Sequence, residues 1–509
     1  MVRALAVIAA LTVVTLATPA AAAPNKVAQL VAQLTLDEKL SLVHGGTDPH
    51  GIAESGYIPG VPRLGIPGLR MADGSSGIRT NIPSTTLPAP VSLASSFDPG
   101  LARDYGTVLG RDGRAENMNV LLGPTTGIIR TPYGGRDFES YSEDPLVSAE
   151  TVAQDVRGIQ SQGLIATVKH FAENNQETDR DGINVHVGDQ ALHQIELPAF
   201  QSAVDAGAGA VMCSYNQING QQMCGNGDLL DGVLRAQWGF AGWVMSDWDA
   251  THATDAITQG VDQEMPDGTY FGDPLKKAIQ NGTIPMSALN TAVTRILTVM
   301  DRFHLLDKNP PAAPKPDHAA DDRTANQVAE QGAVLLKNKA NVLPLNGNSS
   351  VAVIGPTAQT PKVSGGGSGK GNPTHAAAPI DTIRARVGGA VTYTPGGDLF
   401  GQPIPATAFD PPLPIAPDGT VSLPLYTGYQ GSITVPTDGD YRIWSAPPGS
   451  PTCSSTPRTS SAVTEPVSAP ANSPSTSSRA STTSPSSRCS APTPARSKSA
   501  GSPRRNPNH

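Results

Sequence analysis

The sequence predicts an α/β protein whose larger, first part is a barrel of parallel strands. Short apolar runs alternate with segments of helical periodicity from about residue 26 to residue 305, which is the pattern of repeated β-α units. The apolar runs end in polar residues, as expected where the strands of a barrel form a site. A proline-rich stretch, 307–322, then separates this part from a region of different composition.

Individual strands and helices follow from the same periodicities. The candidate strands are residues 119–122, 166–170, 210–214 and 243–246. The candidate helices are residues 147–162, 190–205 and 287–303, in which apolar residues recur at near-helical spacing. Thr35 and Glu38 have the spacing of a capping box, so a helix should begin there.

Each of these strands is followed by groups that can contact a ligand. The strand ends are Gly123-Pro124, Lys169-His170, Ser214-Tyr215-Asn216 and Ser246-Asp247-Trp248. Asp247 is the most informative of them, because it ends the apolar run Trp243-Val244-Met245 and is therefore expected to be buried. A buried, unpaired charge costs several kcal/mol, roughly, so Asp247 is either a paired structural residue or a reactive group.

A second domain is expected after the linker, which we place at residues 306–322. Residues 323–395 open with a helix-like run through Val328, Ala333 and Leu336, and a strand ending in a turn follows at 350–356. The glycine-rich run 364–373 is not a phosphate loop, because Ser364 stands where that motif needs Gly, and Gly371 where it needs Ser or Thr. We interpret it as a loop that approaches another segment closely.

The last part of the chain, residues 396–509, changes character twice. Residues 396–445 contain β-branched and aromatic residues between turn signals, which predicts the start of an all-β module. Residues 446–509 are rich in Ser, Thr and Pro and cannot bury enough apolar surface to fold, so a disordered tail is expected. The tail is interpreted either as a glycosylated stalk or, the reading we favour, as the product of a frameshift.

Charge, cysteines and the N-terminus bound the class of protein. A net charge of −8 gives no footprint for nucleic acid, and no Cys or His cluster has metal-ligand spacing. Cys213 and Cys224 flank a short loop, which favours a disulfide over two free thiols. Residues 1–23 resemble a secretory signal peptide, with a retained N-terminal anchor as the alternative, so we expect a secreted protein without a membrane span.

Five ordered motifs resemble one enzyme family. They are "VPRLGIPGLRMADGSSGIR", "GGRDFESYSEDP", "VKHFAENNQETDR", "MCSYNQING" and "VMSDWDA". Together they are similar to family 3 glycoside hydrolases, especially the β-glucosidase branch, over about residues 58–305 and less closely over 323–395. The resemblance implies a TIM-like (β/α) barrel domain at 24–305, then the start of an α/β sandwich at 323–395 and of a β-sandwich insert at 396–445. It also implies hydrolysis of terminal β-linked glucose with retention of configuration.

The resemblance assigns roles to individual residues. Asp247 would be the nucleophile, and Asp249 is its rival by spacing alone. Asp73 would bind the sugar hydroxyls farthest from the scissile bond, although Ser stands where the family usually has Pro after "DG". The remaining residues expected to bind substrate are Arg79, Arg136, Lys169, His170, Tyr215, Trp248 and Met265. Core packing is the alternative role for Met265.

A retaining glycosidase also needs an acid/base carboxyl about 5 Å from the nucleophile. In this branch of the family that glutamate lies in the second domain, and no motif in this sequence identifies it; Glu465, in the tail, has no supporting motif. The chain is therefore expected to be a C-terminally truncated or frameshifted β-glucosidase whose partner is a small glycoside and which needs no cofactor. The alternatives are a catalytically silent sugar-binding protein and a xylosidase or arabinosidase of the same family.

Overall fold

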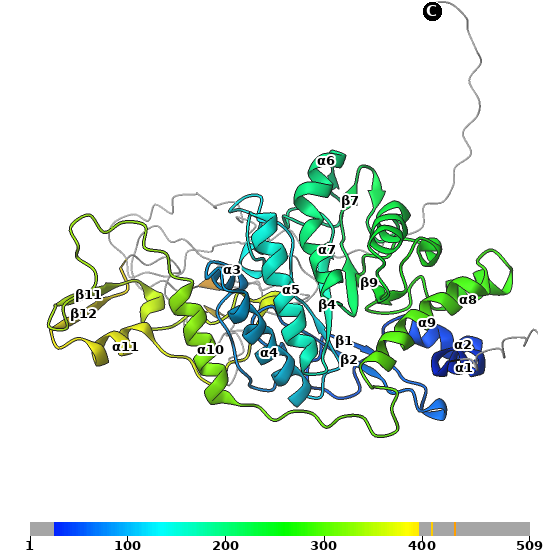
Figure 1. Cartoon of the computed structure of the whole chain (residues 1–509), viewed down its shortest axis with the longest axis horizontal. Helices are drawn as coiled ribbons and strands as arrows, with labels where there is room; N and C mark the ends of the chain where they lie inside the picture. The colour runs from blue at the N-terminus through cyan, green and yellow to red at the C-terminus, as the bar shows by residue number, and fades with distance from the viewer. Residues whose placement is uncertain (1–24, 397–408, 411–431, 434–509) are drawn as a thin grey trace, which may run out of the picture. The chain divides into compact units, whose positions relative to one another are not determined.

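The structure is a computed structural model that describes residues 25–396, 409–410 and 432–433 (Figure 1). The chain divides into two units, and almost everything described belongs to the first, which contains residues 1–395. Of the second unit only a two-stranded antiparallel ladder is described, β13 (Phe409–Asp410) with β14 (Ser432–Ile433). The predicted signal peptide at 1–23, the tail at 446–509 and most of the predicted β-module lie outside the described residues.

Seven strands form the central sheet of the first unit, and their spatial order follows the chain. The strands are β1 (Gly56–Ile58), β2 (Leu69–Asp73), β3 (Val120–Leu122), β4 (Ile165–Phe171), β6 (Ala210–Cys213), β9 (Trp243–Trp248) and β10 (Gln263–Met265). β1 pairs antiparallel with β2, and every later neighbour is parallel. This confirms the predicted barrel of parallel strands.

The segment before β1 nearly closes this sheet into a barrel. Gly45 N donates to Glu264 O of β10 at 2.9 Å, and Glu264 N donates to Val43 O at 2.9 Å. On the other side, Gly46 N donates to Tyr57 O of β1 at 2.8 Å. The first and last strands are thus joined through one short stretch of backbone, so the sheet has almost no free edge.

Helices follow the strands and pack outside them (Figure 1). The helices of this first part are α1 (Lys26–Gln33), α2 (Leu36–Leu42), α3 (Pro90–Ala94), α4 (Pro99–Ala115), α5 (Pro145–Ser161), α6 (Asp189–Ala191), α7 (Pro198–Asp205), α8 (Asp273–Gln280) and α9 (Met286–Arg302). Thr35 and Glu38 form the predicted capping box of α2. α4 and α5 each begin with Pro after a capping Asp, Asp98 or Asp144, whose carboxylate accepts from the first free N–H groups.

α4 and α5 approach each other through glycines. A Cβ at Gly106 would overlap the backbone of Asp155, and a Cβ at Gly158 would overlap the backbone of Arg103. Because glycine lacks that atom, the two helices pack side by side at close range. The strand residues beneath them are buried throughout β3 and β4, as expected for a sheet covered on both faces.

The predicted helix at 190–205 is not a regular helix. It consists of α6, a π-helical stretch from Leu192 to Glu196, and α7 after Pro198. Pro198 cannot donate the backbone hydrogen bond that a continuous helix needs at this position, so the α-helical ladder is interrupted. A second π-helical stretch, Asp228–Gln237, precedes β9. The helices predicted at 147–162 and 287–303 correspond to α5 and α9.

The region after the barrel contains α10 (His318–Gln331), β11 (Val351–Ile354), α11 (Pro379–Arg386) and β12 (Val391–Thr394), with β11 and β12 parallel. α10 begins inside the predicted linker and ends at Gln331, so the expectation of a helix through Ala333 and Leu336 is wrong. Gly332 is the C-cap residue, and a Cβ there would overlap Ser92 O of α3, so the helix ends at a close contact that only glycine allows. In the described part of the chain, the longest helices are too short or too polar to cross a membrane.

Candidate active site

The carboxyl ends of β2, β4 and β9 bring four of the predicted residues together. Asp73 ends β2, Lys169 and His170 lie near the end of β4, and Asp247 lies near the end of β9. Lys169 Nζ donates to Asp73 Oδ1 at 2.9 Å, and His170 Nε2 lies 3.4 Å from Asp247 Oδ2. The two side chains of β4 therefore connect two carboxylates that come from strands on opposite sides of it.

Lys169 and His170 both reach the site although the strand continues to Phe171. Strict alternation would place consecutive side chains on opposite faces, so both can share a pocket only at the end of a strand, and the strand was predicted to end at His170. The pairing of β4 with β6 is irregular between Val168 and Phe171, and this irregularity breaks the alternation.

Asp247 is held by two hydrogen bonds to one of its oxygens. Tyr215 Oη donates to Oδ1 at 2.9 Å, and the backbone N–H of Trp248 donates to the same atom at 2.8 Å. The residue is 7% exposed. Oδ2 makes no hydrogen bond among the described residues. Asp247 therefore has one anchored oxygen and one free oxygen inside a buried site.

His170 explains why Oδ2 has no donor. Burial, with help from the positive charges of Arg136 and Lys169, holds the pKa of His170 well below its usual range, so the ring is neutral. Arg136 Nη1 lies 3.2 Å from His170 Nε2, and a guanidinium can only donate. Nε2 therefore accepts, the ring hydrogen lies on Nδ1, and the nitrogen that faces Asp247 offers it no proton.

Burial and the neighbouring charges shift the pKa of Asp247 in opposite directions. Burial raises the pKa of Asp247 above its ordinary value, while the charges of Lys169, Arg136 and Arg180 and the Trp248 N–H oppose the rise. The pKa of Tyr215 is raised, first by burial and then by the Asp247 charge, so the phenol keeps its proton and acts as a donor. Arg180 lies over the Tyr215 ring, 4.2 Å from its centroid.

Asp73 forms the other end of the site. Arg79 Nη1 donates to Asp73 Oδ2 at 3.3 Å, so the carboxylate is paired with both Arg79 and Lys169. Burial would raise its pKa, but the two cations prevail and the pKa of Asp73 is lowered. Asp73 is thus an ionised acceptor about 13% exposed at its side chain, as a group that binds sugar hydroxyls should be.

Trp248 and Met265 occupy the wall next to β1. A Cβ built on Gly56 would lie 3.1 Å from the Trp248 ring and 2.7 Å from the Met265 methyl group. Trp248 is half-buried, which leaves part of the ring available for stacking. Met265 is 1% exposed, and this position supports its alternative role in core packing.

The rival carboxylate, Asp249, does not share the environment of Asp247. Its side chain is exposed, its backbone φ is 63°, and its N–H donates to Met265 O at 2.9 Å. Tyr215, the Trp248 N–H and His170 all contact Asp247 instead. The geometry therefore favours Asp247 as the reactive group.

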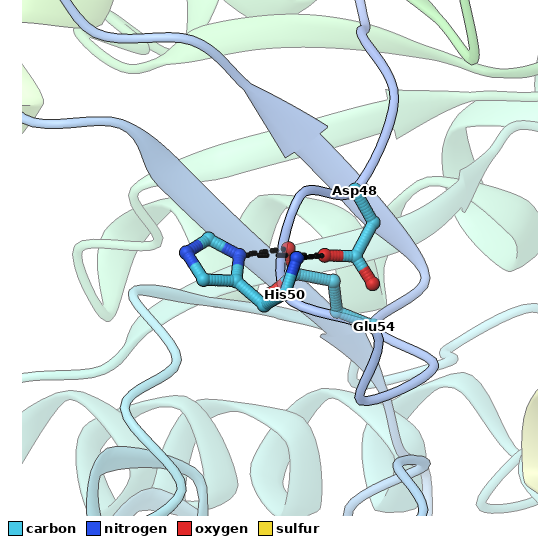
Figure 2. A group of neighbouring side chains, drawn as sticks. All are labelled: Asp48, His50 and Glu54. Atoms are coloured by element: carbon cyan, nitrogen blue, oxygen red, sulfur yellow. Dashed lines mark hydrogen bonds and ion pairs between the residues drawn. The ribbon is translucent and has the colours of Figure 1, made fainter.

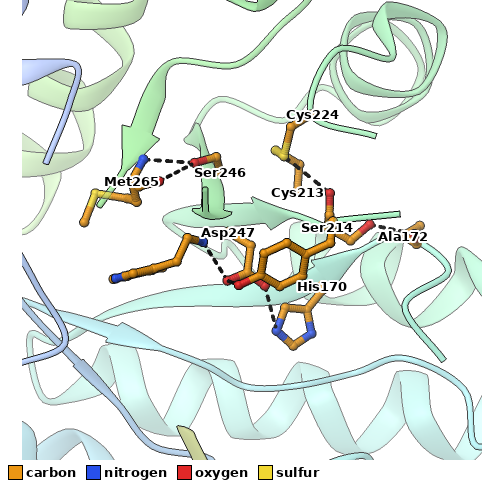
Figure 3. The surroundings of a disulfide bond; sticks show 10 residues. His170, Ala172, Cys213, Ser214, Cys224, Ser246, Asp247 and Met265 are labelled. Carbon is orange, nitrogen blue, oxygen red and sulfur yellow. Dashed lines mark hydrogen bonds and ion pairs between the residues drawn. A yellow bond between two sulfur atoms is a disulfide. The ribbon is translucent and has the colours of Figure 1, made fainter. Parts of the chain in front are cut away.

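A disulfide joins Cys213 at the end of β6 to Cys224 and closes the loop that begins with Ser214 and Tyr215 (Figure 3). Cys213 is paired with Ser246 across the sheet, one residue before Asp247. Ser214 Oγ donates to Ala172 O at 2.8 Å. The disulfide thus anchors the segment that supplies the Tyr215 phenol.

Several site residues were not identified from the sequence. Arg136 donates to Glu139 Oε1 at 3.0 Å and to Glu139 Oε2 at 3.1 Å, and Arg180 donates to Glu177 at 2.7 Å. Glu139, Glu177 and Arg180 all lie inside the quoted motifs, so the motifs carried a signal for them. Ser368 is different, because nothing in its local sequence indicates a partner 232 positions away in the chain.

Ser368 reaches the site through the glycine-rich loop. Arg136 Nη2 donates to Ser368 Oγ at 2.8 Å. A Cβ at Gly365 would overlap the Phe138 ring, and a Cβ at Gly369 would lie 2.9 Å from it. This confirms the expectation that the loop approaches another segment closely, and that segment is the one that carries Arg136.

One group with metal-ligand chemistry forms in three dimensions. The ligand atoms of Asp48, His50 and Glu54 lie within 4.8 Å of one another (Figure 2). Glu54 is already bonded through both oxygens, at 3.0 Å to His50 Nδ1 and at 2.7 Å to Arg70 Nε. We therefore assign the group a structural role in the loop before β1.

Two family models and several relatives match this chain. The family model of the glycosyl hydrolase family 3 N terminal domain matches residues 59–299, and that of the glycosyl hydrolase family 3 C-terminal domain matches residues 333–489. A β-glucosidase of Rhizobium radiobacter is 38% identical over 374 residues, which are 70% of this chain and 44% of that protein. An exo-alpha-(1->6)-L-arabinopyranosidase of Bifidobacterium breve is 35% identical over 400 residues, covering 73% of this chain and 51% of that protein.

Solved structures give the same result. The structure of DesR, a β-glucosidase from Streptomyces venezuelae in complex with D-glucose, aligns with a TM-score of 0.76 at 49% identity and covers 82% of this chain and 56% of that chain. The chain spans about half the length of the curated relatives it matches, with 44% of the Rhizobium protein covered. Because the two family models together match most of the sequence, including all five motifs and the site residues at the strand ends, the chain belongs to glycosyl hydrolase family 3.

Proposed function

We propose that this chain is a retaining β-glucosidase that releases terminal β-D-glucose through a covalent glycosyl-enzyme on Asp247. The observation that carries the proposal is the asymmetry of this carboxylate: Oδ1 accepts from Tyr215 and Trp248, while Oδ2 is buried and free of hydrogen bonds among the described residues. A nucleophile needs one anchored oxygen for orientation and one free lone pair for attack.

The proposed first step uses groups that the barrel supplies. Oδ2 of Asp247 attacks the anomeric carbon, the bond from that carbon to the leaving oxygen breaks, and its electron pair remains on that oxygen. Tyr215 keeps its hydrogen bond to Oδ1 and holds the carboxylate in position. The neighbouring cations Lys169, Arg136 and Arg180 oppose protonation of Asp247 and so counteract burial, which raises its pKa.

The second carboxyl of the reaction is not assigned among the described residues. Glu139 and Glu177 lie in the same charged cluster, but each already accepts hydrogen bonds from an arginine, Arg136 or Arg180, so neither is assigned the role of acid/base. A missing acid/base costs on the order of 10²–10⁴ in rate with poor leaving groups. This observation supports a second candidate, a protein that binds the sugar without turning it over.

Leaving-group chemistry separates the two candidates. A 2,4-dinitrophenyl β-glucoside needs no proton on its leaving oxygen, so the full chain should release the phenol from it, and added azide should accept the glucosyl group. Cellobiose, whose leaving alcohol needs an acid, should react far more slowly. Glucose binding by calorimetry without release of dinitrophenol would support the silent binding protein instead.

Two variants test the assignment of the nucleophile. Asp247→Ala should abolish release of dinitrophenol, while Asp249→Ala, the matched control two residues away, should retain it. Treatment with a 2-fluoro glucoside should label Asp247, as read by mass spectrometry of peptides. Unchanged activity in Asp247→Ala, or a label on another residue, would refute the mechanism.

The sugar specificity within the family needs its own comparison. The arabinopyranosidase of Bifidobacterium breve is nearly as similar to this chain as the β-glucosidases are. We infer that glucose is the substrate because the β-glucosidase of Streptomyces venezuelae, which is 49% identical, is seen in complex with D-glucose. Turnover of dinitrophenyl glucoside should therefore exceed that of the matching xyloside and arabinopyranoside. If the xyloside or the arabinopyranoside is turned over faster, that sugar and not glucose is the substrate.

We also propose that the protein is secreted. Residues 1–23 have the composition of a signal peptide, and the disulfide between Cys213 and Cys224 supports an oxidising compartment. Mass spectrometry of protein recovered from culture medium should find an N-terminus close to Ala23. A protein that stays in the cell with its first 23 residues attached would contradict the proposal.

A further inference from the structure

Ser55 lies directly behind the end of the site that is farthest from Asp247. It is half-buried and precedes β1 by one residue. Its Oγ accepts from the backbone N–H of Asp73 at 2.9 Å and from Arg79 Nη1 at 3.3 Å. One hydroxyl thus contacts both members of the Asp73–Arg79 pair.

These contacts determine where the pair can lie. Arg79 Nη1 is shared between Ser55 Oγ and Asp73 Oδ2, each at 3.3 Å. Hydrogen bonding from Ser55 also contributes, after the larger effects of burial, Lys169 and Arg79, to the pKa of Asp73, which is lowered. Without the hydroxyl, Arg79 would lose one of its two acceptors, and a long, partly exposed side chain would regain rotamer freedom.

Ser55 is itself immobilised by its neighbours. Its N–H donates to Met71 O of β2 at 2.8 Å. The preceding residue, Glu54, has a fully buried side chain that accepts from Arg70 of β2 at 2.7 Å and from His50 at 3.0 Å (Figure 2). The hydrogen bonds within the group of Asp48, His50 and Glu54, and from Arg70 to Glu54, therefore hold the segment that contains Ser55 against β2.

The position of Ser55 gives it a defined role in sugar recognition. Along β4, Lys169 contacts Asp73 while the next residue, His170, lies beside Asp247. A pyranose whose first carbon lies at Asp247 Oδ2 places its fourth carbon across the ring, toward Asp73. We propose that Ser55 is a positioning residue: it holds Asp73 and Arg79 in the positions from which they bind the 4-hydroxyl of the sugar. The inference rests on the proposed function, because it takes glucose as the ligand.

Ligand pairs test this role more sharply than activity does. Calorimetry on the full chain would compare glucose with 4-deoxyglucose for the wild type, Ser55→Ala and Ser55→Thr. Ser55→Ala should bind glucose roughly tenfold more weakly, as expected for loss of a hydrogen bond to a charged group. It should also discriminate less between the two sugars. Ser55→Thr keeps the hydroxyl, so its glucose affinity and its ratio of affinities for the two sugars should both lie within about twofold of the wild type.

A matched control separates positioning from general destabilisation. Ser202 is also half-buried, and its hydroxyl donates to Ala149 O at 2.8 Å, between α7 and α5 and outside the site. Ser202→Ala should leave both sugar affinities unchanged. Thermal unfolding of all variants, without sugar, shows whether any change in binding follows a change in folding.

Each outcome decides between defined alternatives. Equal glucose binding by Ser55→Ala and the wild type overturns the inference while the proposed function stands. Weaker binding of both sugars by the same factor overturns it too, because a merely structural role would act in that way. A wild type that binds neither sugar refutes the proposed function and the inference together, and the 2-fluoro glucoside label on Asp247 reports on the function independently.

Discussion

The barrel and the region that follows it bury their apolar residues to very different degrees. In β4 every residue is buried, whereas β11 and β12 alternate between half-buried and exposed positions. Ile296 of α9 is completely buried, but Leu336 is 91% exposed and Ile354 is 69% exposed. The barrel therefore contains its own core, while residues 333–396 have only a small one among the described residues.

The part of the second region that is well packed is the part that contacts the barrel. Val328 of α10 is completely buried, Asp321 forms an ion pair with Arg111 of α4, and Thr85 donates to Asp321 at 3.4 Å. The glycine-rich loop adds Ser368 to the charged cluster around Arg136. The comparison shows that the site depends on the barrel for its nucleophile, while the second region supplies the hydrogen bond from Arg136 to Ser368 and the packing of the glycine-rich loop on Phe138.

The largest difference between the two regions should appear in core truncations. Ile296→Ala removes buried methyl groups from a core that cannot collapse around them, so we expect the free energy of unfolding to fall by about 2–5 kcal/mol. Leu336→Ala removes atoms that are already in water and should change it by less than about 0.5 kcal/mol. Urea unfolding measures both, and similar losses would mean that residue 336 is packed in solution.

The barrel also contains buried ionisable groups. Asp155 of α5 is 1% exposed and accepts from Tyr141 Oη at 2.5 Å, and burial raises the pKa of its carboxyl to about 7. A carboxyl with a raised pKa takes up a proton on folding, so its contribution to stability is present near pH 4 and is lost as the pH rises toward 7.

Asp155→Asn should therefore remove part of the pH dependence of the free energy of unfolding. Relative to this variant, the wild type should lose about 2–4 kcal/mol of unfolding free energy between pH 4 and pH 7.5. Asp381→Asn, at a position 73% exposed on α11, is the control from the second region and should have no comparable effect. Parallel pH curves for the wild type and Asp155→Asn would contradict the assignment.

Removing the disulfide should change the free energy of unfolding somewhat less than the substitutions at Ile296 and Asp155. Cys213 and Cys224 close a loop with a separation of 11 residues, and the double variant Cys213→Ser/Cys224→Ser should cost about 2–3 kcal/mol of stability. Because Tyr215 begins this loop, release of dinitrophenol should also fall, and the fall should remain at temperatures far below unfolding. Unchanged turnover at full folding would show that the barrel positions Tyr215 without the disulfide.

How much could be predicted from the sequence differs between the same two regions. Strands β3, β4, β6 and β9 and helices α5 and α9 follow from periodicity, because a barrel repeats one pattern under one kind of burial, and the cap at Thr35 follows from the spacing of Thr35 and Glu38. Asp247 was found because it ends a predicted strand, and Asp73 was found through the resemblance of its motif to the family. In the second region, the helix prediction through Leu336 failed because α10 ends at Gly332, and the apolar residues after it are exposed within the described part of the chain.

The missed residues had physical reasons to be missed. Ser55 and Ser368 carry no charge and act through one hydroxyl each, so neither their type nor their spacing distinguishes them from a surface serine. Their partners, Arg79 and Arg136, lie on other segments, and only the closed barrel and the docked loop bring them together. Long-range contacts of this kind leave no periodic signal in a single sequence.

The smallest expected effect concerns the contact between the two regions. A methyl group at Gly365 would overlap the Phe138 ring, so Gly365→Ala should push the loop outward and break the hydrogen bond from Arg136 to Ser368. Loss of one charged hydrogen bond predicts about fivefold weaker glucose binding by calorimetry. Gly347→Ala, whose Cβ would meet nothing within 4 Å, is the control.

A compensating change makes the last prediction specific. Phe138→Leu shrinks the side chain that the new methyl group would meet, so the double variant Gly365→Ala/Phe138→Leu should bind glucose more tightly than Gly365→Ala alone. Such a recovery of glucose affinity is expected only if the loop influences the sugar site through its packing against Phe138. If the double variant binds as weakly as the sum of the two single changes predicts, the second region influences the sugar site by another route than the loop.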